Sequence, residues 1–229
     1  MDQKIKSLLD SLDYTRSEFW NISKETGLFL NKLIRATPSI KTILEIGTSN
    51  GVSAIYMAEA LKAKKEELLE IKSKNFLPKN IPLSKETIAV KSRVSQKPNS
   101  KKTFHLYTIE SHKKLRYKLA TENFKKAGLT QYITQILGHA PEVIPKNPKY
   151  FDLIFLDATK YEHTDYLKAI LPRTYFNSRT SKGSIIITDN AISHKKNLKP
   201  YFKEVKKLKK FKTHLIKISS GLLVSERVE

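Results

Sequence analysis

The feature that most constrains the fold is an alternation of short apolar segments with helical patterns. Five apolar runs, rich in β-branched residues and followed by turn residues, alternate with segments whose apolar residues recur at helical spacing. Such runs are typical of buried strands, and the alternation favours a parallel, doubly wound sheet with helices on both faces. We expect strands at 42–46, 104–109, 132–137, 151–156 and 184–188, and helices at 52–61, 113–127, 164–171 and 198–207.

The two ends of the chain depart from this alternation. A short helix is expected at 5–12, and Ser23 is placed to cap a second helix with Leu28, Phe29 and Leu33 on its inner face. These helices form a predicted N-terminal helical cap over residues 1–40. At the other end, strands at 211–218 and 221–227 have only Ser219-Ser220-Gly221 between them. This pattern predicts an antiparallel hairpin at one edge of the sheet.

The fold class follows from these elements. We predict an α/β fold: a Rossmann-like, doubly wound, mostly parallel seven-stranded sheet with helices on both faces and a C-terminal antiparallel hairpin. The chain has 229 residues, 39% of them hydrophobic, which is enough for one core. A single domain over 1–229 is therefore expected.

A basic insertion at 62–103 separates the first helix of the alternation from the second strand. Residues 64–74 suit an extension of that helix, and 75–100 suit a loop. Loops of this length are usually functional lids or disordered insertions.

The net charge of +21 is concentrated in two stretches. Residues 62–103 hold twelve Lys/Arg against four Glu, and residues 195–217 hold ten Lys against one Glu. Such stretches can attract nucleic acid, tRNA included, acidic substrates or anionic membrane surfaces. Solvated helix faces explain them equally well, because lysine far outnumbers arginine, which is the better phosphate ligand.

Several functional classes are excluded or disfavoured by composition. The chain has no cysteine, which excludes disulfides, thiolate metal sites and cysteine nucleophiles. Its first residues lack the continuous apolar stretch of a signal peptide, and no apolar run approaches the roughly 20 residues that span a bilayer. We therefore expect a cytoplasmic protein without a membrane partner.

A glycine turn follows the first strand, in Leu44-Glu-Ile-Gly-Thr-Ser-Asn-Gly-Val-Ser53. Ligands of doubly wound sheets bind at the carboxyl ends of strands, and Gly47 and Gly51 would allow close approach to the backbone. The spacing matches neither a dinucleotide fingerprint nor a P-loop, so a pyrophosphate ligand is not favoured. Glu45 at the strand end suits a cationic group, although an ordinary tight turn is an equal alternative.

Acidic residues end three further strands. Glu110 ends the second strand, where an acid can bind both ribose hydroxyls of an adenosine; the alternative is a charge facing the dipole of the next helix. Asp157 follows the fourth strand, and Asp189 with Asn190 follows the fifth. Their oxygens suit a hard cation such as Mg²⁺. The alternative is helix capping by Asp157 and a turn at Asp189 and Asn190.

In order along the chain, these motifs resemble the class I metal-dependent O-methyltransferases of the catechol and caffeoyl-CoA type. The set is Leu-Glu-Ile-Gly-Thr-Ser-Asn-Gly, Thr-Ile-Glu, Phe-Leu-Asp-Ala-x-Lys and Thr-Asp-Asn, and the resemblance covers roughly residues 20–227 except the insertion. It implies S-adenosylmethionine as cofactor. The implied cofactor contacts are Glu45 and Ser53 with the methionine part, Gly47 with its close approach, Glu110 with the ribose, Ala140 beside the adenine, and Ser23.

The resemblance also implies a reaction. Asp157, Asp189 and Asn190 would bind the cation, and Lys160 would be the general base. The methyl group would pass to a metal-chelated hydroxyl of a small, catechol-like acceptor. Two alternatives stay open: a tRNA methyltransferase acting on a hydroxylated uridine, and a non-catalytic RNA-binding relative.

Two departures from the family pattern stand out. Thr159 stands where many relatives have a second acid, which weakens any mechanism with an extra carboxylate. His139 stands where an acid is common, so the adenine edge of the site is expected to differ.

Other side chains near the expected cleft carry weaker hypotheses. His163 and His194 are candidate bases or ligands, although a lone histidine is more often structural. Tyr161 and Trp20 are candidates for stacking on an aromatic acceptor, with core packing as the alternative. Tyr14 and Phe19, near Trp20, indicate an apolar cap over the site or a homodimer contact.

Overall fold

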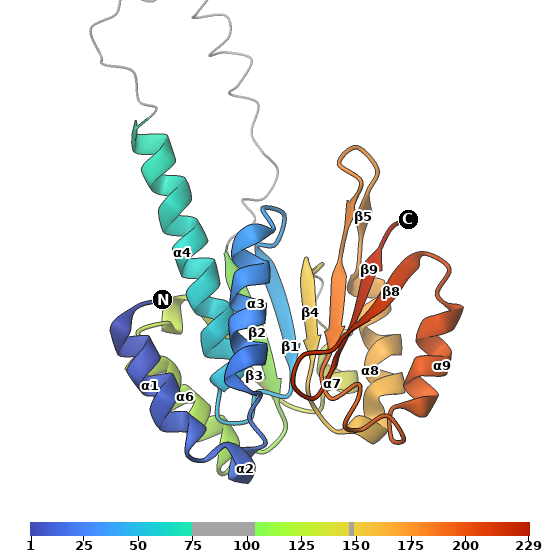
Figure 1. Ribbon diagram of the computed structural model, residues 1–229, viewed down its shortest axis with the longest axis horizontal. Helices are drawn as coiled ribbons and strands as arrows, with labels where there is room; N and C mark the ends of the chain where they lie inside the picture. The colour runs from blue at the N-terminus through green and yellow to red at the C-terminus, as the bar shows by residue number, and fades with distance from the viewer. Residues whose placement is uncertain (75–103, 147–148) are drawn as a thin grey trace, which may run out of the picture.

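A central sheet organises the computed structural model, which describes residues 1–74, 104–146 and 149–229 (Figure 1). The sheet is seven-stranded, in the order β3-β2-β1-β4-β7-β9-β8. The first five strands of this order are parallel, whereas β9 is antiparallel to both β7 and β8, so the predicted sheet and closing hairpin are confirmed. The strands are β1 (Thr42–Ile46), β2 (His105–Glu110), β3 (Ile133–Leu137), β4 (Leu153–Leu156), β7 (Ile185–Thr188), β8 (Phe211–Ile216) and β9 (Leu222–Arg227).

The central strands are apolar on both faces, which explains their continuous apolar runs. Ile43 of β1 packs in one hydrophobic cluster, whereas Leu44 and Ile46 pack in a second cluster on the opposite face. Glu45 is the exception within β1, since it is a fully buried acid in an otherwise apolar run.

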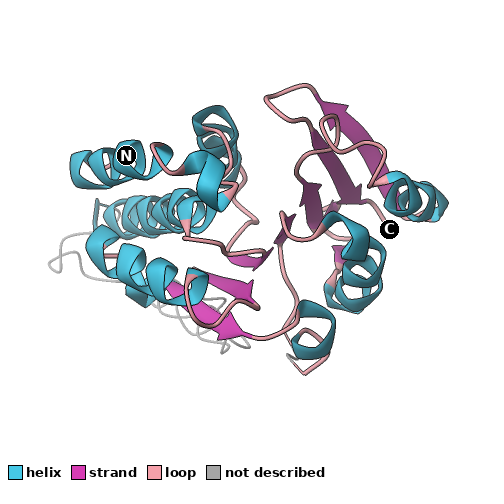
Figure 2. Ribbon diagram, turned by 90° about the horizontal axis from the view of Figure 1, so that it is seen from below, coloured by secondary structure: helices cyan, strands magenta, loops and turns pink. Residues whose placement is uncertain are grey.

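Helices cover both faces of the sheet, as the view from below shows (Figure 2). The first hydrophobic cluster lies under α1 (Gln3–Asp13), α3 (Lys24–Ala36), α4 (Val52–Lys74) and α6 (Arg116–Ala127). The second lies under α7 (Ala140–Val143), α8 (His163–Ile170) and α9 (Lys199–Lys207).

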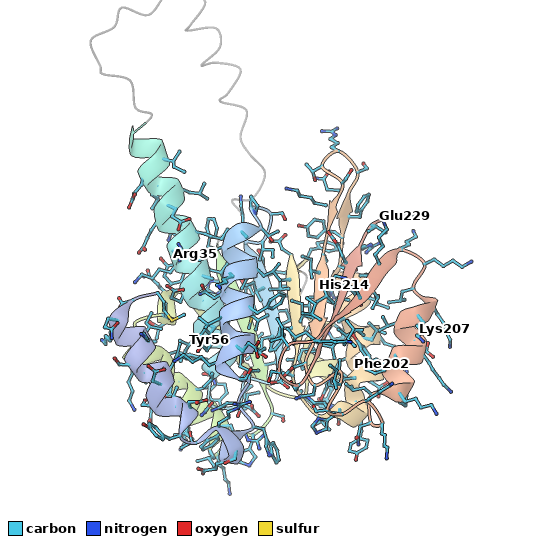
Figure 3. The ribbon with its side chains drawn as sticks, viewed as in Figure 1. Arg35, Tyr56, Phe202, Lys207, His214 and Glu229 are labelled. Carbon is cyan, nitrogen blue, oxygen red and sulfur yellow. The ribbon has the colours of Figure 1, made fainter. Side chains whose placement is uncertain are left out.

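The inner face of α3 agrees only in part with the predicted one. Phe29 and Leu33 pack against the core as predicted, but Leu28 is 39% exposed. The buried residues of the helix are Thr26, Gly27, Leu30, Asn31 and Ile34. Gly27 is the reason for the difference, because a Cβ there would lie 2.3 Å from Cε2 of Tyr56, which Figure 3 shows on α4 beside α3. The two helices therefore meet along a face that includes Gly27 and Asn31, so it lacks a continuous apolar pattern in the sequence.

Part of the basic insertion is used inside the protein. As predicted, α4 continues through residues 64–74. Lys64 is buried, and its Nζ donates to the carbonyls of Thr37 and Ile40 at 2.7 and 2.6 Å, beyond the end of α3. Lys64 is therefore not available to a partner, and residues 75–103 of the insertion lie outside the described residues.

Several short elements were not predicted, among them α2 (Arg16–Phe19), α7 and the paired strands β5 (Phe176–Asn177) and β6 (Lys182–Gly183). Strands of two residues are too short to leave a periodic pattern. Among the described helices, none combines the length and the apolar character that crossing a membrane requires.

Candidate active site

One large cavity opens at the carboxyl ends of the parallel strands, the side from which Figure 2 is drawn. Its volume is about 1150 Å³. Pockets that hold one drug-sized ligand span roughly 300–1,000 Å³, so this cavity has room for a second molecule. The predicted site residues in its lining are Gly47, Ser53, Glu110, Ala140, Asp157, Lys160 and Asn190; Ser23, Glu45 and Asp189 are not in the lining.

The glycines of the turn after β1 serve packing more than ligand approach. Gly47 has a φ of 102°, and a Cβ there would lie 2.3 Å from the carbonyl oxygen of Asp157. Gly51 has a φ of 94° and faces the ring of Phe124 instead of the cavity. Gly47 lines the cavity, so close approach of a ligand there stays a prediction, whereas Gly51 does not line it.

Glu45 lies behind the cavity wall in a buried hydrogen-bonded chain. Ser53 Oγ donates to Glu45 Oε1, and Thr108 Oγ1 donates to Glu45 Oε2 at 2.5 Å. Thr48 Oγ1 lies 2.5 Å from Thr108 Oγ1. Both ends of this chain, Thr48 and Ser53, line the cavity. Glu45 therefore reaches a ligand only through its hydroxyl partners.

Burial also changes the ionisation of this carboxyl group. It raises the pKa of Glu45 to about 8, against the hydrogen bonds from Ser53 and Thr108 that lower it. A cationic ligand group beside Ser53 would favour the ionised form.

The sequence did not predict the roles of Thr48 and Thr108 in this hydrogen-bonded chain. For Thr108 a signal was available, because it is a polar residue inside an apolar strand and the parallel register pairs it with Glu45.

Glu110 is held at the cavity edge by backbone donors. Its Oε2 accepts from the N–H of Ser49 and its Oε1 accepts from the N–H of His112, both at 2.8 Å. The next helix, α6, begins only at Arg116, with no acid in its first turn. The helix-dipole alternative for Glu110 is therefore wrong.

The segment beside Ala140 carries an unpredicted bridge across the cavity wall. His139 Nε2 lies 3.1 Å from Oε2 of Glu162, which also accepts from the Tyr166 hydroxyl at 2.5 Å. The carboxylates of Glu162 and Glu142 raise the pKa of His139. The bridge ties the end of β3 to the segment after β4, and all three bridging residues line the cavity.

The acidic residues after β4 and β7 continue adjacent strands. Asp157 N–H donates to the carbonyl of Ile46, and Asp189 N–H donates to that of Leu156, both at 3.0 Å. Asp157 caps no helix, because the next helical turn begins at Lys160 with Thr159 as its N-cap residue. Burial and the charge of Asp189 raise the pKa of Asp157 to about 7, against the lowering effect of Lys160.

Asp157 and Asp189 each accept a side-chain hydrogen bond with one carboxylate oxygen. Within the described residues, the other oxygen of each carboxylate has no hydrogen bond. Lys160 Nζ donates to Asp157 Oδ1 at 2.8 Å, and Ser220 Oγ donates to Asp189 Oδ1 at 2.7 Å. The free carboxylate oxygens of Asp157 and Asp189 and the amide oxygen of Asn190 are hard donors, of the kind that Mg²⁺ prefers. The described residues hold no cluster of three or more His, Cys, Asp or Glu that suits a metal, so the amide is needed to complete this set.

The remaining candidates separate into cavity residues and structural ones. His163 is buried between the rings of Tyr166 and Tyr201, its pKa is lowered to about 4 by burial, and it lies outside the cavity. His194 lines the cavity. Ser23 Oγ accepts from the N–H of Thr26 at 3.1 Å as the N-cap of α3, so its contact with a cofactor stays a prediction.

The aromatic side chains predicted to stack or to cap the site are largely exposed at the cavity. Tyr14, Trp20 and Tyr161 are 92%, 74% and 79% exposed, and all three line the cavity, so core packing is not their role. Phe19 is buried and also borders the cavity. A homodimer contact through these rings stays a prediction.

A large cavity at the carboxyl ends of the strands of a doubly wound sheet is the usual place for a ligand in α/β proteins, and comparison with known proteins identifies the family. The chain belongs to the family described as "Methyltransferase domain", whose model matches residues 44–191. This match confirms the resemblance carried by the motifs.

Individual relatives agree with this assignment. A catechol O-methyltransferase of Niastella koreensis is 29% identical over 177 residues, which cover 75% of this chain. The match spans only 58% of that protein's length.

Solved structures share the fold. The SAH-bound methyltransferase PaMTH1 of Podospora anserina has a TM-score of 0.71 at 19% identity, covering 100% of this chain and 89% of that one. The O-methyltransferase TomG of Streptomyces achromogenes, in complex with SAM, has a TM-score of 0.67 at 18% identity, covering 100% and 91%.

Proposed function

We propose that this protein transfers a methyl group from S-adenosylmethionine to a hydroxyl of a small aromatic acceptor chelated by a divalent cation. One observation carries the proposal: Glu110 and Gly47 share a single cavity with Asp157, Lys160 and Asn190. The predicted cofactor end and the predicted metal end are thus parts of one site. The SAH bound to PaMTH1 and the SAM bound to TomG support the choice of cofactor.

The chain's own residues divide the work of the reaction. When bound, the sulfonium cofactor supplies an electrophilic methyl group, and a divalent cation lowers the pKa of a coordinated hydroxyl. Glu110 would accept hydrogen bonds from the ribose hydroxyls. Ser53, whose hydroxyl donates to Glu45, would contact the amino-acid part of the cofactor. Positioning of this kind contributes several kcal/mol to catalysis.

Lys160 takes the acceptor's proton when its amine is neutral. It lies at the cavity wall, where its bond to Asp157 Oδ1 orients the Nζ atom beside the predicted metal ligands. A base within hydrogen-bonding reach of the hydroxyl contributes about 10²- to 10⁴-fold to such a step.

The rim of the cavity supports an aromatic acceptor. The three exposed rings of Tyr14, Trp20 and Tyr161 offer π-faces at the cavity mouth. The guanidinium carbon of Arg116 lies over the Trp20 ring, 5.0 Å from its centroid, a distance typical of a cation–π contact. The catechol activity named for the Niastella relative agrees with an aromatic substrate class.

The test is methyl transfer to a panel of catechols with and without EDTA. We expect EDTA to abolish turnover, added Mg²⁺ to restore it, and Asp189→Asn to lower it strongly. Asp165→Asn is the matched control, because Asp165 is an exposed acid on α8 paired with Lys168 at 3.0 Å. Turnover that persists in EDTA would rule out chelation while leaving methyl transfer in place.

The tRNA and non-catalytic hypotheses are not favoured by the relatives described above. The tRNA hypothesis can be tested directly against the small-molecule proposal. Labelled methyl transfer to tRNA at low salt, in the absence of transfer to any catechol, would replace the small-molecule proposal.

A further inference from the structure

The turn of the C-terminal hairpin is bonded to the turn that carries Asp189 and Asn190. The N–H groups of Ile192 and Ser193 donate to the carbonyl of Ser220 at 2.9 and 3.1 Å, and the N–H of Ala191 donates to the carbonyl of Gly221 at 2.9 Å. The Ser220 hydroxyl adds the 2.7 Å bond to Asp189 Oδ1. Two segments separated by about 30 residues of sequence thus form one bonded unit.

Both turns contain residues in the left-handed region of backbone conformation. Asn190 has a φ of 62°, Ser219 a φ of 48° and Gly221 a φ of 86°. A Cβ at Gly221 would lie 2.4 Å from Cγ1 of Ile192, so the two turns are in close contact. Non-glycine residues persist in such conformations only where the surroundings over-determine them, and they cluster at functional sites.

The bond from Ser220 selects the direction of the Asp189 carboxylate. The Asp189 backbone is fixed to β4 through its N–H, and its side chain is 2% exposed. With Oδ1 occupied by the serine hydroxyl, Oδ2 is the oxygen left for a ligand, and the residue that follows, Asn190, lines the cavity.

We propose that Ser220 is a positioning residue that orients Asp189 for a divalent cation, with the hairpin turn as its rigid support. The inference rests on the proposed metal-dependent function. Partners of this kind, which hydrogen-bond to a metal ligand without touching the metal, typically contribute 10- to 100-fold to metal affinity.

The experiment is a calorimetric titration of the full chain with Mn²⁺ alone. It compares the parent with Ser220→Ala, Ser220→Thr and Ser225→Ala. Ser225 is the matched control, because its hydroxyl lies 2.9 Å from Thr213 Oγ1 in the same hairpin but not in the turn. We expect Ser220→Ala to weaken Mn²⁺ binding by about tenfold or more. Ser220→Thr should restore most of the affinity, and Ser225→Ala should leave it unchanged.

Binding of S-adenosylmethionine provides a second readout. Ser220 does not line the cavity, so Ser220→Ala should bind the cofactor as the parent does. Equal Mn²⁺ affinities for Ser220→Ala and Ser225→Ala would overturn the positioning role and leave the metal site standing. A parent protein that binds no Mn²⁺ would overturn both this inference and the metal-dependent function.

Discussion

Glu45 illustrates how one buried residue makes the stability of the protein depend on pH. Burial raises its pKa from 4.5 to about 8. Between these values the folded state keeps a proton that the unfolded state has released, so the free energy of unfolding falls as pH rises through this window. Since one pKa unit corresponds to about 1.4 kcal/mol, the effect amounts to a few kcal/mol.

The Glu45→Gln variant tests this dependence. We expect its free energy of unfolding, measured by denaturant titration from pH 5 to 8, to fall less steeply than that of the parent, because the amide does not ionise. Glu122→Gln, at an exposed position on α6, should keep the parental slope. Parallel curves for the parent and Glu45→Gln would show that the buried carboxyl ionises normally.

Lys160 is the residue on which the proposed proton transfer depends. Replacing it with methionine keeps the aliphatic stem and removes the base, so kcat for catechol methylation should fall by about 10²-fold or more. The dissociation constant for S-adenosylmethionine should stay near the parental value. Lys168→Met on α8 serves as the control, and an unchanged kcat in Lys160→Met would assign the proton to another acceptor.

At the scale of elements, Ser23 at the start of α3 has two candidate roles, capping the helix and contacting the cofactor. Its hydroxyl caps the helix through the N–H of Thr26, and loss of such a cap costs about 1 kcal/mol. Ser23→Ala should therefore lower the free energy of unfolding by that amount without changing cofactor affinity, whereas Ser23→Asp should retain the cap. A loss of cofactor affinity in Ser23→Ala at unchanged stability would favour the contact implied by the family resemblance.

Elements were predictable to different degrees. The strands and long helices were predicted because burial on both faces of a parallel sheet leaves apolar runs, and because helices leave a 3.6-residue period. The contact face of α3 was predicted only in part, since it depends on the fit of Gly27 against Tyr56 on another helix. The two-residue strands β5 and β6 have no period to detect.

At the scale of the whole molecule, charge is unevenly distributed. All ten lysines of residues 195–217 are exposed, and the only acid of this stretch, Glu204, is paired with Lys207 at 2.7 Å. Figure 3 shows Lys207 at the edge of the molecule on α9. Like charges concentrated in one exposed stretch destabilise the compact state through mutual repulsion.

Salt should relieve this repulsion, because the screening length falls from about 30 Å at 0.01 M to about 8 Å at 0.15 M. We expect the melting temperature to rise between these salt concentrations, and to rise less in a Lys206→Glu, Lys210→Glu variant. Lys168→Glu, outside the basic stretch, should behave as the parent does. A melting temperature that falls with added salt would indicate that attractive pairs dominate the surface.

The sequence by itself determined the order of strands and helices, the closing hairpin and the edge at which Gly47, Glu110, Asp157 and Asn190 gather. These follow from local patterns, since parallel strands in one sheet bring their carboxyl ends to the same side. Only the tertiary structure decided which side chains face the cavity. Glu45 accepts a hydrogen bond from Thr108, which is 63 positions away in the sequence. Asp189 accepts one from Ser220, which is 31 positions away. Side-chain contacts over such separations depend on packing, which no local pattern records.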